Sequence, residues 1–97
     1  MVLLIAKYYV TEGNVDTVID ALRKMAPLVK EHEPDCSLYT ANRSQENPNL
    51  IVLVEQYTDM DAIAAHRETP HFKEIIEGTV VPLLEKRERE FFDVVVG

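Results

Sequence analysis

Two histidines and a glutamate within a strand are the side chains of this sequence best suited to proton transfer. His66 and His71 lie five positions apart, and Glu55 interrupts the apolar run LIVLVEQY. An imidazole exchanges a proton near neutral pH, which is what removing a proton from a phenol or an acidic C–H requires. A carboxylate in a central strand needs a partner or has a raised pKa, so Glu55 could orient a histidine or act as a base in a cleft.

Structural interpretations of the same residues stay open. His66 is expected near the end of a helix, where its imidazole would interact favourably with the negative end of the helix dipole and hydrogen-bond to a backbone carbonyl. His71, in the first turn of the next helix, would serve as a hydrogen bonder at a helix start. Glu55 could instead form an ion pair with Arg43, Lys7 or a residue of a second subunit.

The residue pattern gives little support to metal or cofactor binding. An i, i+5 spacing does not bring His66 and His71 onto one metal ion from a regular helix. The single cysteine, Cys36, excludes an internal disulfide framework and a multi-thiolate zinc site. No sequence neighbour lowers the pKa of its thiol, so it is not expected to be a nucleophile. Because a Gly-rich phosphate loop, a GxSxG turn and a flavin fingerprint are also missing, we expect no metal and no tightly bound organic cofactor.

Three aromatic residues, Tyr39, Tyr57 and Phe72, could line an apolar pocket for a flat ring. Together with His71 they form the expected substrate-binding set. The alternative is that these aromatic side chains are ordinary core residues.

The chain has the length of one domain, residues 1–97, and the composition of a folded globular protein. Apolar residues make up 46% of it and charged residues 28%. Four stretches have the patterns of strands: Val2–Val10, Cys36–Arg43, Leu50–Tyr57 and Arg87–Val96. The short polar connection SQENPN predicts that the second and third strands form an antiparallel hairpin.

The longest helical pattern follows Asn14, a suitable N-cap, and reaches about His32. Pro27 lies inside this pattern and predicts a kink or a break there.

Two shorter helices are expected further along the chain. One runs from its cap Asp59 to about Arg67. The other is capped by Thr69, has Pro70 at its first position and is expected to end at Gly78.

The resulting order of elements predicts an α+β, ferredoxin-like split βαβ fold with a four-stranded antiparallel sheet. Helices can cover only one face of such a sheet, but LIVLVEQY and FFDVVV are apolar at successive positions and hence on both faces. We therefore expect a homodimer in which sheet packs on sheet.

Charge and hydropathy limit the partners. Seventeen acidic and ten basic residues give a net charge of −7, which disfavours nucleic acid and anionic membrane surfaces. The sequence has neither the ~20 consecutive apolar residues of a membrane span nor the pattern of a signal peptide. A cytoplasmic location is expected.

The stretch Val54–Ile76 resembles the signature of the antibiotic biosynthesis monooxygenase (ABM) domain family, which includes quinol monooxygenases. The matching parts are the strand end EQY, the Asp-led helix that contains His66, and the step TPHF at positions 69–72. The resemblance implies a dimeric α+β barrel and a cofactor-independent monooxygenase, an oxidoreductase that oxidises a small quinol or aromatic polyketide-like substrate with O₂. In this chemistry His66, helped by Glu55, would be the catalytic base.

Two other functions stay open: a non-catalytic dimeric module that binds a small ligand or a partner protein, and an isomerase of a small phosphorylated signalling molecule, of the autoinducer-2 processing type. The isomerase would need a cationic anchor near the cavity, for which Arg43 and Arg67 are the candidates. Haem degradation, the activity of a sister group with this fold, is disfavoured, because His66 and Ile76 occupy the places of that group's Trp and haem-binding His.

Overall fold

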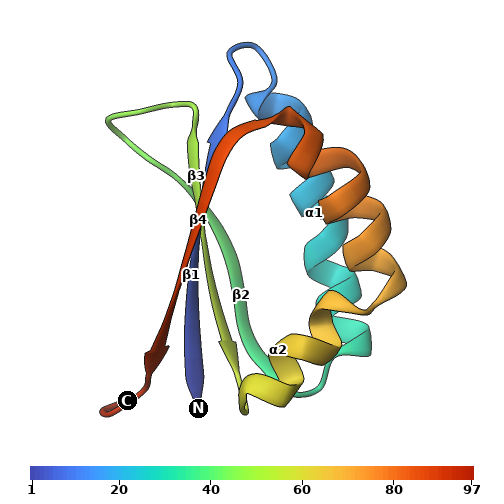
Figure 1. The fold of residues 1–97 in the computed structure, drawn as a ribbon, viewed down its shortest axis with the longest axis vertical. Helices are drawn as coiled ribbons and strands as arrows, with labels where there is room; N and C mark the ends of the chain where they lie inside the picture. Colours follow the sequence, from blue (N-terminus) through green and yellow to red (C-terminus); the bar gives the residue numbers. More distant parts are fainter.

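A sheet and a layer of helices make up the computed structural model, which describes residues 1–97 (Figure 1). The sheet has four antiparallel strands in the spatial order β2-β3-β1-β4. Their bounds are β1 Val2–Val10, β2 Cys36–Arg43, β3 Leu50–Tyr57 and β4 Leu84–Asp93. The α+β, ferredoxin-like fold expected from the sequence is confirmed, as is the β2–β3 hairpin.

The helices all lie on one side of the sheet (Figure 1). They are α1 (Val15–His32), α2 (Met60–Arg67), the wide π-type helix η1 (Phe72–Val80) and the short 3₁₀ turn η2 (Val81–Leu83). The expected cap of α2 is confirmed, since the Asp59 carboxylate accepts a hydrogen bond from the Ala62 N–H at 2.9 Å. Asn14 is the N-cap residue of α1, but its side chain donates to Thr11 Oγ1 instead of capping the helix. None of the helices combines the length and apolar character that a membrane span needs.

The core lies between the helices and the inner face of the sheet. Every second residue of β1 and β3 points into it, because side chains alternate along a strand. The helices contribute apolar stripes at helical spacing. The main cluster contains Ala6, Tyr8, Val10, Val15, Val18, Ala21, Leu22, Met25, Val29, Ile51, Leu53, Phe72, Ile76 and Val80.

A break at Pro27 and a helix end at Gly78, both predicted from the sequence, do not occur. α1 continues through Pro27. Because proline has no N–H, the Arg23 carbonyl has no hydrogen-bond partner within the helix. Both residues are exposed, so water can bond this carbonyl. η1 continues past Gly78 to Val80, which is fully buried. Burial of the Val80 side chain, worth about 1.5–3 kcal/mol, outweighs a cost of about 1 kcal/mol for a glycine inside a helix.

The last strand begins and ends three residues earlier in the sequence than the predicted strand. β4 begins at Leu84, opposite Val10, and ends at Asp93, opposite Val2. Val95 and Val96 lie outside the sheet and are exposed. The expected strand Arg87–Val96 is therefore wrong at both ends.

The outer face of the sheet carries apolar side chains that no helix covers. They are partly buried or exposed and come from all four strands: Leu3, Ile5, Leu38, Val52, Val54 and Phe92. This face is apolar over much of β1 and β3, as the sequence pattern of β3 indicates, but Lys86, Glu88 and Glu90 of β4 lie on the same face.

Replacing Pro27 by alanine restores an N–H that can bond the Arg23 carbonyl. We expect Pro27→Ala to raise the free energy of unfolding by about 1–3 kcal/mol, measured by urea denaturation at neutral pH. Pro82→Ala is the matched control, because Pro82 lies in the first turn of η2, where a missing N–H costs nothing and no gain is expected. A loss of stability in Pro27→Ala would show that α1 needs the geometry of its proline.

Candidate active site

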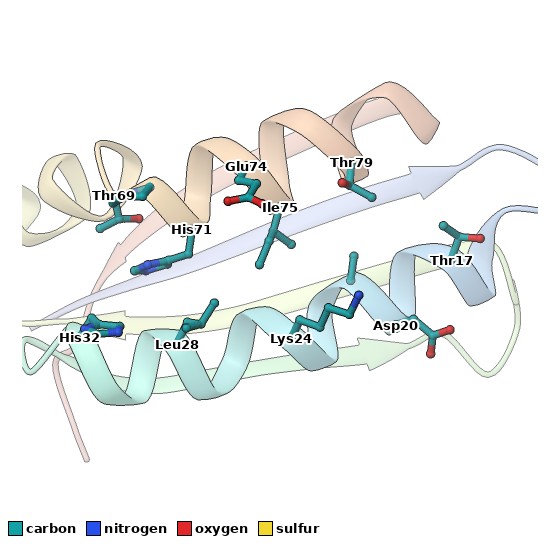
Figure 2. Close-up of a pocket in the computed structure, with 12 residues that line it drawn as sticks. Thr17, Asp20, Lys24, Leu28, His32, Thr69, His71, Glu74, Ile75 and Thr79 are labelled. Carbon is teal, nitrogen blue, oxygen red and sulfur yellow. The ribbon is translucent and has the colours of Figure 1, made fainter.

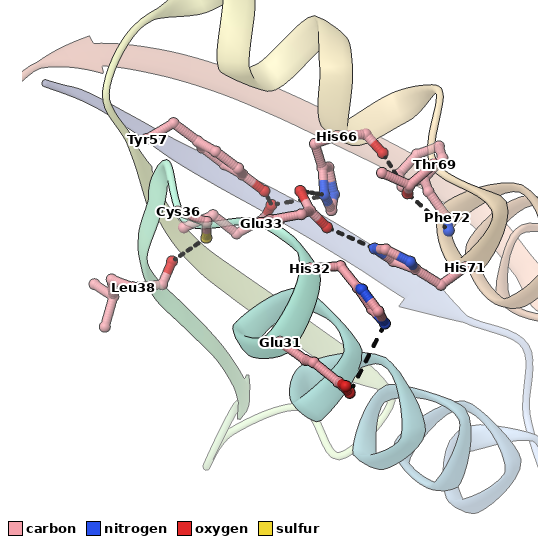
Figure 3. Close-up of polar contacts among 11 residues, drawn as sticks. Glu31, His32, Glu33, Cys36, Leu38, Tyr57, His66, Thr69, His71 and Phe72 are labelled. Atoms are coloured by element: carbon pink, nitrogen blue, oxygen red, sulfur yellow. Dashed lines mark hydrogen bonds and ion pairs between the residues drawn. The ribbon is translucent and has the colours of Figure 1, made fainter.

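One carboxylate, that of Glu33, joins both candidate histidines (Figure 3). Glu33 Oε1 lies 2.7 Å from His66 Nδ1, and Glu33 Oε2 lies 2.6 Å from His71 Nε2. An ionised carboxylate can only accept hydrogen bonds, so both imidazoles donate to it. A neutral His66 consequently carries its proton on Nδ1 and has a free lone pair on Nε2.

Glu33 is the residue that ends α1, and its side chain is buried. Burial acts to raise the pKa of this carboxyl, but the hydrogen bonds from His66 and His71 outweigh it and hold the pKa below its ordinary value. A carboxylate at a helix C-terminus also meets the negative end of the helix dipole. The two N–H donors therefore stabilise a charge that neither its burial nor its helix favours.

The second nitrogen of His66 faces Glu55. Its Nε2 lies 3.7 Å from Glu55 Oε1, which is longer than a hydrogen bond. The same Glu55 oxygen accepts a hydrogen bond from the Tyr57 hydroxyl at 2.5 Å. Burial raises the pKa of Glu55, although Tyr57 and His66 act against it. Burial and the neighbouring Glu55 likewise raise the pKa of Tyr57.

An ion pair of Glu55 with Arg43 or Lys7 is a wrong prediction. The Arg43 guanidinium donates to the Pro48 carbonyl in the loop between β2 and β3. Lys7 is exposed and pairs in register with Val52, on the outer face of the sheet. Glu55 points inward, and side-chain direction along a strand alternates, so Lys7 cannot reach it.

The expected aromatic residues surround the His66 ring. The ring centroids of Phe72, Tyr57 and Tyr39 lie 5.0, 5.4 and 6.0 Å from that of His66. The Phe72 ring meets the imidazole edge-on. Phe72 and Tyr57 are buried and Tyr39 is half-buried, so the imidazole lies in apolar surroundings with phenol groups at its border.

Hollows lie on both sides of His66. One, of about 140 Å³, is bordered by Cys36, Tyr57 and Ala65. The other, of about 20 Å³, lies beside Glu55 and Phe72 and has room for one water. A larger groove of about 820 Å³ runs between α1 and η1 and reaches His71 but not His66 (Figure 2). The groove and the hollow of about 140 Å³ share His32 and Thr69 in their walls.

Glu33 is the site residue that sequence reasoning missed. It stands 33 positions from His66 and 38 from His71 along the chain, so no local motif connects them. The available signal is a carboxylate directly after the last turn of a helix, where the dipole disfavours it.

Cys36 borders the hollow of about 140 Å³ beside His66. Burial raises the pKa of the Cys36 thiol to about 11, in keeping with a residue that is not a nucleophile. No group of three or more His, Cys, Asp or Glu side chains is arranged to hold a metal ion. His66 Nδ1 and His71 Nε2 are each hydrogen-bonded to an oxygen of Glu33.

Known proteins with this fold were found by sequence and by structure. The profile of the antibiotic biosynthesis monooxygenase (ABM) family matches residues 1–78. No curated protein sequence matches the chain.

Several solved structures share the fold. A candidate antibiotic biosynthesis monooxygenase of Caulobacter crescentus CB15 is 25% identical, with a TM-score of 0.91 over 98% of this chain and 90% of that one. An antibiotic biosynthesis monooxygenase with 23% identity has a TM-score of 0.89 over 99% and 100% of the two chains. A conserved protein of Methanosarcina mazei Go1, also 23% identical, has a TM-score of 0.85 over 94% and 89%.

The last two likenesses show the fold alone, whereas the profile matches the sequence itself over most of its length. With its split βαβ topology and its profile match together, the chain belongs to the antibiotic biosynthesis monooxygenase family.

Proposed function

We propose that this protein is a cytoplasmic, cofactor-independent monooxygenase that oxidises a small quinol or aromatic polyketide-like substrate with O₂. The observation that carries the proposal is the state of His66. Its Nδ1 is held by the Glu33 carboxylate, and its Nε2 is left free in a buried, aromatic-lined site. A histidine oriented in this way is a general base with a fixed direction of attack.

The reaction begins with proton removal from a bound hydroquinone-like ring. His66 Nε2 takes the proton of a substrate hydroxyl, and Glu33 stabilises the imidazolium that forms. The electron-rich anion then reduces O₂ and combines with it at a ring carbon. Loss of water from the resulting hydroperoxide leaves a carbonyl, so one oxygen atom enters the product and the other leaves as water. The substrate supplies all the electrons.

The neighbouring residues have distinct roles in this proposal. Glu55, whose pKa is raised by burial, and the Tyr57 hydroxyl bonded to it bind a substrate oxygen beside His66 Nε2. Phe72 and Tyr39 contact the ring and exclude water, which protects the reactive anion. His71 acts through Glu33 and is a positioning residue.

Replacing His66 tests the base directly. We expect His66→Ala to lower kcat/KM for O₂ uptake with a panel of quinols by about 100-fold or more. His32→Ala is the matched control, because this third histidine is exposed and bonds neither Glu33 nor Glu55; its ring stacks on that of His71, with the centroids 6.0 Å apart. Equal rates in His66→Ala and wild type would remove His66 from the mechanism. Binding of quinols by the wild type without any O₂ uptake would favour a ligand-binding module instead.

Glu33→Gln tests the carboxylate that orients both histidines. An amide can accept from one imidazole only, so one ring must change tautomer, and we expect kcat to fall by about tenfold or more. The nitrogen NMR shifts of the His66 ring report the tautomer, which a merely structural role of Glu33 would not move. Glu31→Gln, an exposed neighbour, is the control and should leave both readouts unchanged. An unchanged kcat and unchanged ring shifts in Glu33→Gln would contradict the assigned role.

The same variant has an expected effect on stability against pH. The folded-state pKa of Glu33 lies below its ordinary value of 4.5, so its contribution is present above about pH 4.5 and is lost as the pH falls through the lowered pKa. Glu33→Gln should therefore lose less stability than the wild type on acidification below pH 4.5, measured by urea denaturation.

We also propose that the protein is a homodimer that packs through the outer face of its sheet. The support is the row of apolar side chains on this face, among them Leu3, Ile5, Val52 and Val54, which no helix covers. An isologous pair of such faces would bury this apolar surface by a two-fold axis.

Val54→Glu places a carboxylate in the middle of this face. We expect sedimentation velocity to show a dimer for the wild type and a monomer for Val54→Glu, because burying an unpaired charge at the interface costs several kcal/mol. Lys24→Glu, an exposed change on the helical side, should leave the dimer intact. A monomeric wild type would overturn the proposal.

A further inference from the structure

Three of the five arginines of this protein gather at one edge of the site. Arg87 and Arg89 lie opposite Tyr8 and Ala6 in the sheet register, so their side chains share the inner face with the core. Arg67 is the last residue of α2, directly after His66. All three line the small hollow that also contains Glu55 and His66.

These arginines have no carboxylate partner within the chain. The ion pairs of the structure involve Arg23, the histidines, Lys73 and Lys86, but not Arg67, Arg87 or Arg89. Burial, followed by the repulsion of Arg67 and Arg87, lowers the pKa of Arg89. Glu55, the one carboxylate that lines the same hollow, attracts Arg89 but forms no ion pair with it.

An apolar surface adjoins the arginines. Phe91 follows on the same face of β4, opposite Leu4, and is 41% exposed. The Arg89 guanidinium lies 5.9 Å from the centroid of its ring. The uncovered inner face of β4 thus offers a ring surface and cationic groups together, a combination suited to a flat anionic molecule.

We propose that Arg67, Arg87 and Arg89 bind an oxyanion group of the substrate, a carboxylate or a phosphate, and that the substrate of this site is an anionic aromatic molecule. The inference rests on the function proposed above and names its substrate class. The anion lies at the open edge of the sheet, and the ring extends from it toward His66, where the acidic hydroxyl meets Nε2. Guanidinium groups suit this role because their planar fork matches carboxylate and phosphate oxygens.

The shape of the site agrees with this direction of binding. The hollow beside His66 Nε2 is too small, at about 20 Å³, to enclose a ring. Part of its border consists of the exposed Arg67 of α2 and Arg87 and Arg89 of β4, side chains that can rearrange around a ligand. On the opposite side the Glu33 carboxylate repels an anion.

The experiment compares three probes with the same ring: hydroquinone, its ring carboxylate gentisate, and hydroxyphenyl phosphate. Binding is followed by shifts of backbone amide signals in NMR titrations, and O₂ uptake is recorded separately. The variants are Arg89→Gln and the double change Arg87→Gln with Arg89→Gln. Arg43→Gln is the matched control, because Arg43 is exposed and its side chain hydrogen-bonds to the Pro48 carbonyl in the loop between β2 and β3.

We expect one of the two anions to bind about tenfold or more tightly than hydroquinone, with an affinity that falls with added salt. The double variant should lose this preference and Arg43→Gln should keep it. Whichever anion binds better identifies the group as a carboxylate or a phosphate. Equal affinity for all three probes, or a preference kept in the double variant, would overturn the inference.

Two further outcomes separate this inference from the proposed function. Anion binding without O₂ uptake would retain the arginine site and reject the monooxygenase. Uptake with hydroquinone, together with equal affinity of the wild type for all three probes, would retain the enzyme and reject the anionic substrate. A wild-type dimer that becomes a monomer in the arginine variants, measured by sedimentation, would also overturn the inference. The arginines would then form ion pairs with acidic residues of a second copy.

Discussion

The site depends on one buried negative charge, the Glu33 carboxylate, and on its need for donors. A buried charge is tolerated only when its oxygens are paired, and Glu33 has one imidazole on each oxygen. These two bonds connect the end of α1 to the last turn of α2 and to the start of η1. The same interaction therefore joins three helices and orients the proposed base, so the geometry of the site and the packing of the helical layer cannot vary independently.

The pairing also gives His66 a direction. Because Nδ1 is committed to Glu33, chemistry at the imidazole can take place only at Nε2, on the side of Glu55 and β4. That side is also where the helices leave the inner face of the sheet uncovered and where Arg87 and Arg89 are exposed. One carboxylate thus selects the reactive nitrogen, and the reactive nitrogen selects the edge of the sheet from which a substrate must arrive.

Local patterns were sufficient for most of the fold and for part of the site. The bounds of β1, β2 and β3 and the cap Asp59 follow from alternation and from capping chemistry, which act over a few residues. The predicted break at Pro27 and the predicted helix end at Gly78 failed for one reason. Each residue disfavours a helix locally, but the opposite face of each helix packs against the core. Glu33 could not be assigned because its partners lie 33 and 38 positions away, and only the fold brings them together.

Two carboxylates flank one imidazole, and their surroundings push their proton affinities in opposite directions. Hydrogen bonds from two histidines overcome burial and lower the pKa of Glu33, whereas burial prevails and raises that of Glu55. Such a separation assigns different roles to chemically identical groups. Glu33 keeps its charge and stabilises a protonated His66, while Glu55, with the Tyr57 hydroxyl bonded to it, can hold a proton close to the oxygen of a bound ligand. A site built from ordinary side chains can then both remove a proton and stabilise the charge that results, because burial and hydrogen bonding, rather than residue type, decide where each proton lies.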